Sequence, residues 1–288
     1  MISFPGMSLL SASATKDNTM LRSNPPRPPR RRDVELYSRA MKWVNSSTQR
    51  RARFGPFLPV MTTPEKAKLL DTWRVFHDAC TSRNISYFFV EGTLLGAIRH
   101  RGIIPWDDDI DIAVDVKDVH RLQHVLSCIP GYTLRVQTNM HWKFFAEDGS
   151  VVLYQTTNYP TTLRAKILPE GQKGSYVVEF EPDKNVVMRF PFLDIFLMKS
   201  DGTYTRALTS YIAPTVTFLT ENVYPLATVP FEDYLAPVPR RSREILRKMH
   251  DVSVCKSPFH NYKLGFAIDH ISSVPCEDLA EMYPVYRV

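Results

Sequence analysis

Residues 91–112, EGTLLGAIRHRGIIPWDDDIDI, constrain the fold and chemistry of this chain more than any other stretch. Four aspartates fall within five positions, at Asp107, Asp108, Asp109 and Asp111, and they run into an apolar segment typical of a strand. Successive side chains of a strand point to opposite faces. Asp109 and Asp111 are therefore predicted to share one face, while the isoleucines between and after them enter the core.

Two carboxylates side by side on a strand repel each other unless a cation lies between them. Ligand sets made only of oxygen suit Mg²⁺ or Mn²⁺. Asp194 is the candidate for a third ligand, because it is the only charged residue in the apolar run FLDIFLM at 192–198. A carboxylate buried in such a strand is costly unless it is paired or metal-bound. An edge-strand aspartate, or one paired with an arginine, is the alternative.

Three carboxylates around Mg²⁺ are what in-line phosphoryl transfer requires. Gly92 and Thr93 open a short helix predicted to run from Thr93 to about Arg99, and a helix N-terminus presents free N–H groups to an anion. Helix capping would explain a Gly-Thr pair alone; its place ahead of the aspartates favours a phosphate site. Arg99 is a further candidate for binding phosphate, with a solvated basic turn as the alternative.

Two other groups near this stretch receive weaker predictions. Asp107 and Asp108 are expected to shape the loop or to bind the water shell of the metal, since alternation points Asp108 away from the ligand face. Lys143, within HWKFF, is a candidate for phosphate binding, although exposure on a strand surface is the favoured interpretation.

The order of apolar patterns predicts alternating helices and strands, followed by antiparallel strands that extend the sheet. A helix capped by Thr63 is expected at the start of 62–84, followed by a strand, the short helix, the acidic strand at 109–115 and an amphipathic helix. Short β-like runs separated by turn residues then predict an extended antiparallel section over 131–198. A last helix is expected over 241–249.

Charge and composition divide the chain in two. Residues 1–53 hold eleven basic and three acidic residues and include NPPRPPRRR, so we predict a disordered basic tail, with residues 54–288 as the folded domain. The folded part carries a net charge of −2, which speaks against nucleic-acid binding. No apolar run is long enough for a transmembrane helix. The four cysteines lack metal-ligand spacing, and a disulfide is possible if the protein is luminal.

The acidic stretch closely resembles the LicD family, which includes the fukutin and fukutin-related proteins, within the nucleotidyltransferase superfamily. The resemblance lies in FVEGTLLGAIR at 89–99, in IPWDDDID at 104–111 and in FLDIF at 192–196. A fainter likeness follows at 225–239. Two departures stand out: Thr93 replaces the usual serine, and Met249-His250 replaces a Tyr-Gly pair, which leaves the acceptor end of the site open.

The resemblance implies a nucleotidyltransferase-like fold of the α+β class, with a mixed sheet flanked by helices. It also implies an enzyme of the EC 2.7 class that transfers a phospho-alcohol, such as phosphocholine or ribitol phosphate. The donor would be CDP-linked and the acceptor a glycan hydroxyl. Asp109, Asp111 and Asp194 would bind the metal and carry the catalysis, and Asp194 would be able to accept the proton of the attacking hydroxyl. Gly92 and Thr93 would hold the donor phosphates.

Two other functions remain open from the sequence. The same three acids would serve transfer of a nucleotide, and a non-catalytic homologue would bind a glycan or a partner enzyme. If the site is catalytic, the three carboxyl groups should lie within about 4–5 Å of one another, given Mg–O bonds near 2.1 Å. The resemblance favours the Golgi or endoplasmic reticulum lumen, while the lack of a clear signal leaves the cytosol as the alternative. The donor alcohol, the acceptor and the oligomeric state are not readable.

Overall fold

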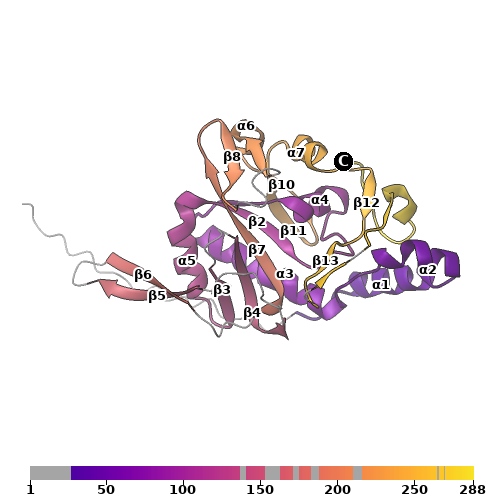
Figure 1. Cartoon of the computed structure of the whole chain (residues 1–288), viewed down its shortest axis with the longest axis horizontal. Coiled ribbons are helices and arrows are strands. Elements are labelled where there is room, and N and C mark those ends of the chain that lie inside the picture. The colour runs from indigo at the N-terminus through magenta and orange to yellow at the C-terminus, as the bar shows by residue number, and fades with distance from the viewer. Residues whose placement is uncertain are drawn as a thin grey trace, which may run out of the picture.

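The computed structural model describes residues 27–136, 141–152, 163–170, 175–182, 188–209, 216–264, 266–268 and 270–288. Within them the α+β fold predicted from the sequence is confirmed: a mixed sheet lies at the centre with helices packed against it (Figure 1). The predicted β runs at 151–155 and 185–190 lie partly outside the described residues, as do residues 1–26 of the predicted tail.

Seven α-helices occur in the part of the chain just defined: α1 Arg31–Val44, α2 Thr48–Phe54, α3 Thr63–Ser82, α4 Glu91–Arg99, α5 Val119–Ser127, α6 Thr220–Val223 and α7 Ser242–Met249. Short 3₁₀ turns lie at Gly55–Phe57, Val116–Asp118 and Cys276–Leu279. The strands are β1 Tyr87–Phe89, β2 Ile110–Asp115, β3 Tyr132–Arg135, β4 His141–Val151, β5 Leu163–Glu170, β6 Ser175–Pro182, β7 Arg189–Ser200, β8 Tyr204–Ala207, β9 Thr217–Leu219, β10 Ala227–Phe231, β11 Tyr234–Val238, β12 Val254–Lys256, β13 His260–Asn261, β14 Phe266–Ala267 and β15 Ser273–Pro275.

The central sheet has the strand order β1-β2-β7-β4-β3, and β8 and β9 extend it beyond β7. Strands β2 and β7 run parallel, whereas the other pairs are antiparallel. The register places Asp111 opposite Asp194, and Asp194 opposite Lys143 on β4. Directly opposite residues point to the same face of a sheet. Two acids and a lysine therefore form one row across three strands.

Helix α3 covers the sheet with a buried apolar stripe that includes Trp73 and Phe76, and it contacts β7, β4 and α5. Its N-terminus is closed by a capping box in which the Thr62 hydroxyl accepts from the Glu65 N–H and the Glu65 carboxylate accepts from the Thr62 N–H. The cap is thus Thr62, one residue before the predicted Thr63. Helix α4 packs on β2.

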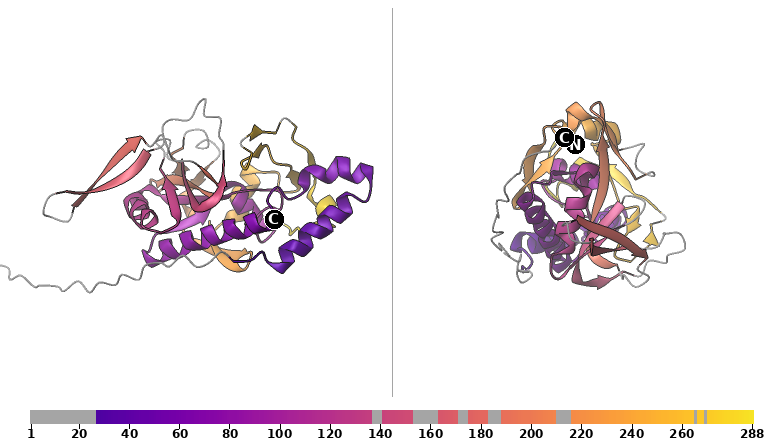
Figure 2. Two further views of the ribbon diagram at one scale, coloured as in Figure 1. Left: turned by 90° about the horizontal axis from the view of Figure 1, so that it is seen from below. Right: turned by 90° about the vertical axis from the view of Figure 1, so that its left-hand side faces the viewer.

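Residues 31–53 do not form the disordered segment that the composition predicted. They fold into α1 and most of α2, which lie together at one end of the molecule (Figures 1 and 2). Ala40 and Val44 are fully buried, and Leu36 packs against the same core. The spacing of these three residues makes an apolar stripe on a helix, which the high arginine content obscured.

Candidate active site

Three buried carboxylates converge where β2 and β7 meet. Asp111 and Asp194 are register partners on these strands, and Asp109 lies immediately before β2. Each of the three is more than nine-tenths buried. One oxygen from each lies within 4.8 Å of the others, which agrees with the spacing expected of a shared divalent cation. The geometry suits a metal, while the roles assigned to these residues remain predictions.

The electrostatics of this cluster favour a bound cation. Burial, followed by repulsion from neighbouring carboxylates, raises the pKa values of Asp109 and Asp111 well above the ordinary range. Burial also raises the pKa of Asp107 to about 6, although the Asp108 amide and Arg99 partly offset it. A divalent ion would relieve this repulsion, because opposite charge favours the ionised form of each carboxyl. The donor set of three carboxylates is of the type that Mg²⁺ and Mn²⁺ prefer.

Asp194 differs from the other two acids because it has cationic neighbours. Lys143 Nζ donates to Asp194 Oδ1, and His141 Nε2 lies 3.0 Å from the same oxygen. Burial raises the pKa of Asp194, but Lys143 and His141 outweigh it and lower that pKa to about 2. An acid this weakly basic suits binding a cation better than accepting a proton. The ligand role of Asp194 is therefore favoured over the proton-accepting role.

Lys143 lies in the interior, contrary to the exposed position favoured by the sequence. Its side chain is more than nine-tenths buried, and Nζ lies 4.0 Å from the centre of the Phe192 ring. The contacts of Lys143 with Asp194 and with Phe192 both follow from the antiparallel register, which places Lys143 directly opposite Asp194. No contact of Lys143 in the structure supports its predicted role as a free phosphate ligand. It binds the third carboxylate instead.

Helix α4 points its N-terminus at the acidic cluster. The helix begins at Glu91, two residues before the predicted start, and Glu91 adopts a positive φ of 45°. A Cβ added to Gly92 would lie 2.9 Å from Asp107 Oδ2 and 3.8 Å from Asp111 Oδ2. Glycine thus preserves the space between the first turn and the carboxylates. The first N–H groups of a helix have no partner within it, so this end can bind an anion.

Thr93 fixes that helix terminus against the sheet. Its buried hydroxyl accepts a hydrogen bond from the Asp111 N–H at 2.7 Å. The hydroxyl is engaged with the strand, so Thr93 sets the distance between the helix and the metal ligands. The predicted phosphate-binding role of Thr93 remains a prediction.

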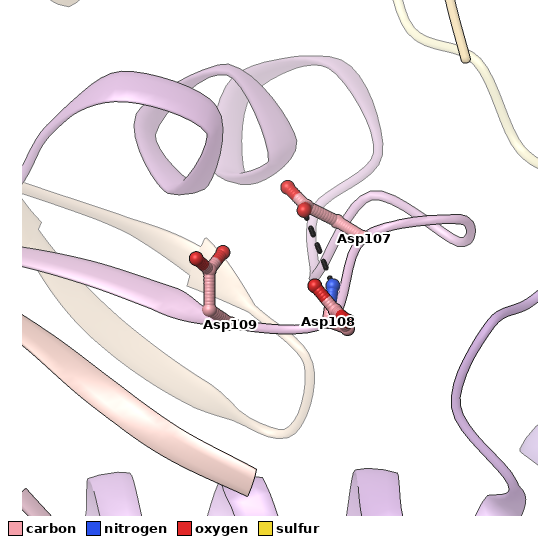
Figure 3. Close-up of side chains that lie close together, drawn as sticks. All are labelled: Asp107, Asp108 and Asp109. Atoms are coloured by element: carbon pink, nitrogen blue, oxygen red, sulfur yellow. Dashed lines mark hydrogen bonds between the residues drawn. The ribbon is translucent and has the colours of Figure 1, made fainter. Parts of the chain in front are cut away.

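The loop of residues 100–109 delivers the aspartates to the strand and is fastened at several points. Figure 3 shows Asp107, Asp108 and Asp109 where the loop enters β2, with Asp107 Oδ1 accepting from the Asp108 N–H at 3.1 Å. Asp108 Oδ2 accepts from the Tyr262 N–H at 3.1 Å. Trp106 Nε1 donates to the Lys256 carbonyl at 2.8 Å. Asp108 is thus committed to holding the loop against the C-terminal segment, as a loop-shaping role predicts.

A cavity of about 450 Å³ opens over the three acids. One wall is formed by the start of α4 and the acidic loop, and the other by a C-terminal segment, residues 249–262, of which the sequence singled out only Met249 and His250. This segment contributes cationic and aromatic side chains at His250, Lys256, Phe259, His260 and Tyr262. Its signal in the sequence was faint because no single residue in it has a distinctive pattern.

Arg99 lines the same cavity but is held by protein groups. Its Nε donates to His100 Nε2 at 3.1 Å, and Nη1 lies 3.4 Å from Cys276 Sγ. Burial lowers the pKa of Arg99 to about 10, against the opposing influence of Asp107. His100 is buried and contacts the Pro284 carbonyl at 2.8 Å, and Arg101 stacks over Tyr286. Phosphate binding by Arg99 stays a prediction.

A disulfide joins Cys255 to Cys276 and ties β12 to the segment after β15. It lies beside the cavity, since its neighbours Val254 and Lys256 both line the wall. The bond therefore stiffens the C-terminal wall of the site. Disulfides form mainly in oxidising compartments.

Comparison with known proteins places these features in a family. Residues 84–179 match the family described as LicD/FKTN/FKRP, nucleotidyltransferase domain. The chain is therefore similar to the LicD family over about a third of its length. The matched range contains α4, the acidic loop and β2, and it ends before Asp194.

Three relatives illustrate the reach of the LicD likeness. The chain is 50% identical over 50 residues to the lipopolysaccharide cholinephosphotransferase LicD of Haemophilus influenzae, covering 17% of this chain and 19% of the relative. It is 48% identical over 60 residues to an uncharacterized protein of Rickettsia prowazekii, covering 20% and 23%. Over 190 residues it is 24% identical to human ribitol 5-phosphate transferase FKRP, covering 66% and 32%. The matches thus span about a fifth to a third of these relatives' lengths.

Proposed function

We propose that this protein is a metal-dependent phosphotransferase that moves a phospho-alcohol, of the phosphocholine or ribitol phosphate type, from a CDP-linked donor to a glycan hydroxyl. The observation that carries the proposal is the convergence of Asp109, Asp111 and Asp194 within 4.8 Å, beside a helix N-terminus and a cavity of about 450 Å³. The names of the LicD and FKRP relatives support the choice of a phospho-alcohol.

The side chains divide the work of such a transfer. Asp109, Asp111 and Asp194 would hold Mg²⁺ or Mn²⁺, which supplies positive charge to the donor phosphates when bound. The N-terminus of α4 adds its own partial positive charge on the same side. Thr93 keeps that terminus at a fixed distance from Asp111. Lys143 holds Asp194 ionised and oriented through Oδ1.

The proposed reaction is a single displacement at phosphorus. The oxygen of the glycan hydroxyl forms a bond to the phosphorus that carries the alcohol, the bond to the bridging oxygen breaks, and CMP leaves. The cavity provides the room for both substrates, and Arg99 and Lys256 on its walls add positive charge near the donor phosphates. The hydroxyl proton passes to solvent or to a substrate oxygen, because Asp194 Oδ1 already accepts from Lys143 and the carboxylate would also bind the metal.

A transfer assay separates this function from its two alternatives. The protein would be incubated with CDP-choline, CDP-ribitol or ordinary nucleoside triphosphates, together with Mg²⁺ or Mn²⁺ and a glycan acceptor. We expect release of CMP and mass addition of a phospho-alcohol to the acceptor. A nucleotide on the acceptor with release of pyrophosphate would instead establish nucleotidyl transfer.

Two variants make that assay specific to the site. Asp111→Asn should abolish turnover because it removes a metal ligand. Asp201→Asn is the matched control, since Asp201 is partly exposed, pairs with Arg206 and lies outside the cavity. Binding of donor or glycan by the wild type without turnover, under every donor and metal, would favour the non-catalytic homologue.

Two considerations support a proposal for the compartment. A disulfide between Cys255 and Cys276 fits an oxidising environment, and glycan acceptors fit the secretory lumen favoured by the family likeness. No helix among the described residues has the length and apolar character needed to cross a membrane. We propose the lumen of the secretory pathway as the working site of the enzyme.

A further inference from the structure

The Arg-rich segment around residue 30 takes part in a charge network, centred on a buried carboxylate, that the proposed function does not explain. Three cations, Arg30, Arg32 and Lys66, meet three acids, Asp33, Glu232 and Asp233. The network joins the start of α1 to α3 and to the turn between β10 and β11. Arginines that composition assigns to a solvated tail are therefore bound to the folded domain.

Glu232 is the centre of this network. Its side chain is only 6% exposed, and Oε2 accepts from Arg30 Nη2 at 2.6 Å and from Arg32 Nη2 at 2.8 Å. Oε1 lies 3.0 Å from Lys66 Nζ. These cations lower the pKa of Glu232 to about 2, although burial opposes the shift. A carboxylate this deeply buried needs its cationic partners, because one left without them is costly.

The same carboxylate also binds the loop that carries the aspartates. Glu232 Oε1 accepts from the Ile103 N–H at 3.0 Å, and the Glu232 N–H donates to the Arg101 carbonyl at 2.7 Å. A Cβ added to Gly102 would lie 2.4 Å from Glu232 Oε1, so the two segments are in close contact. Glu232 itself adopts a positive φ of 56°. Backbone hydrogen bonds tie the start of the loop of residues 100–109 to α4, from the His100 and Gly102 N–H groups to the Gly96 carbonyl. The Glu232 contacts add a tether from outside that helix.

We propose that Arg30 and Arg32, acting through Glu232, are positioning residues for the loop of residues 100–109 that presents the metal-ligand aspartates. The Pro/Arg-rich segment is then part of the scaffold of the site. Each arginine holds Oε2, which leaves Oε1 directed at Lys66 and at the Ile103 amide. Without the arginines, Oε2 would lose both of these donors, Glu232 would be free to rotate away from the loop, and the Ile103 N–H would lose its acceptor.

Hydrogen exchange followed by mass spectrometry tests this on the full-length protein without any assumption about activity. The test variant is Arg30→Ala/Arg32→Ala. The matched control is Arg31→Ala, whose side chain is 92% exposed and pairs only with Glu35 among the described residues. We expect the double variant to exchange about tenfold faster at peptides covering 101–104, because the Ile103 N–H would lose its hydrogen bond to a charged acceptor. The control should match the wild type.

Kinetics supply a second readout, and this arm alone rests on the proposed function. At a temperature well below unfolding, the double variant should need a higher Mg²⁺ concentration for half-maximal activity and show a lower kcat, with the donor KM little changed. Arg30→Lys/Arg32→Lys should recover part of the loss because it restores the cations.

The outcomes distinguish failure of this proposal from failure of the proposed function. Equal exchange at 101–104 in the double variant and the Arg31→Ala control would overturn the positioning role, as would faster exchange spread evenly over the whole protein. A wild type without transferase activity would overturn the proposed function and leave the exchange result to decide the positioning role.

Discussion

Replacing Lys143 by methionine should reveal how strongly this lysine stabilises the metal-free site. The substitution keeps the length of the side chain but leaves Asp194, which is 2% exposed, without its ammonium partner. Removing one partner of a buried ion pair typically costs about 3–5 kcal/mol. For a domain of about this size, such a loss lowers Tm by roughly 6–20 °C, at about 2–4 °C per kcal/mol. Added Mg²⁺ should recover part of it, because the ion compensates the same carboxylates.

A double-mutant cycle measured by thermal unfolding in EDTA checks this reasoning. Asp194→Asn/Lys143→Met removes both charges, so the double variant should be more stable than the sum of the two single losses predicts. Lys117→Met is the matched control, because Lys117 is 70% exposed and pairs with Asp115 at 3.6 Å at the surface. Its loss should stay below about 1 kcal/mol. Strictly additive losses, unaffected by Mg²⁺, would refute a buried Lys143–Asp194 pair.

The remaining predictions concern the phosphate end of the site, the metal ligands and the charge network. Gly92→Ala should leave Tm nearly unchanged but raise the donor KM about tenfold, roughly 1.4 kcal/mol, because a Cβ would lie 2.9 Å from Asp107 Oδ2; an unchanged KM in steady-state assays would contradict this. Asp111→Asn should lower kcat at least about a thousandfold, and a wild-type kcat with an unchanged Mn²⁺ concentration for half-maximal activity would argue against a ligand role. The pKa of Glu232 is lowered from 4.5 to about 2 in the folded protein. Its ionised form therefore stabilises the fold at pH values above 4.5, and this contribution is lost as the pH falls toward 2. The free energy of unfolding of the wild type should therefore exceed that of Glu232→Gln by about 3 kcal/mol at pH 7. Chemical denaturation should show this difference in stability shrinking below pH 4.5.

The acidic cluster was predictable because its residues break local rules. An aspartate inside an apolar strand needs a buried partner, because burying an unpaired carboxylate costs free energy. This requirement identified Asp111 and Asp194 as candidate site residues from the sequence alone. Strand alternation then placed Asp109 and Asp111 on one face. Their convergence with a residue more than eighty positions away follows from the parallel pairing of β2 with β7.

Lys143 and the C-terminal wall could not be predicted in the same way. The contact between Lys143 and Asp194 depends on the register of β4 against β7, which also shifts between Phe145 and Ser150. A residue pattern does not specify such a register. The cavity wall at 249–262 consists of short strands and loops joined by the Cys255–Cys276 disulfide. Its position beside the aspartates depends on tertiary packing, and no local sequence pattern indicates it.

Helix α1 shows the opposite failure, in which composition concealed a pattern. Leu36, Ala40 and Val44 recur every four residues and form an apolar stripe. The surrounding arginines suggested a solvated tail, because charge and proline content are typical of disorder. Arg30 and Arg32 instead bind the acids at the β10–β11 turn.

The most direct test of the account is to locate a metal in crystals of the protein. Crystals grown with Mn²⁺ would be measured at an energy where manganese scatters anomalously. We expect an anomalous peak coordinated by carboxylate oxygens of Asp109, Asp111 and Asp194, at bond lengths of about 2.0–2.3 Å. The absence of a peak at these three residues in crystals soaked at millimolar Mn²⁺, or a peak coordinated elsewhere without them, would contradict the central claim.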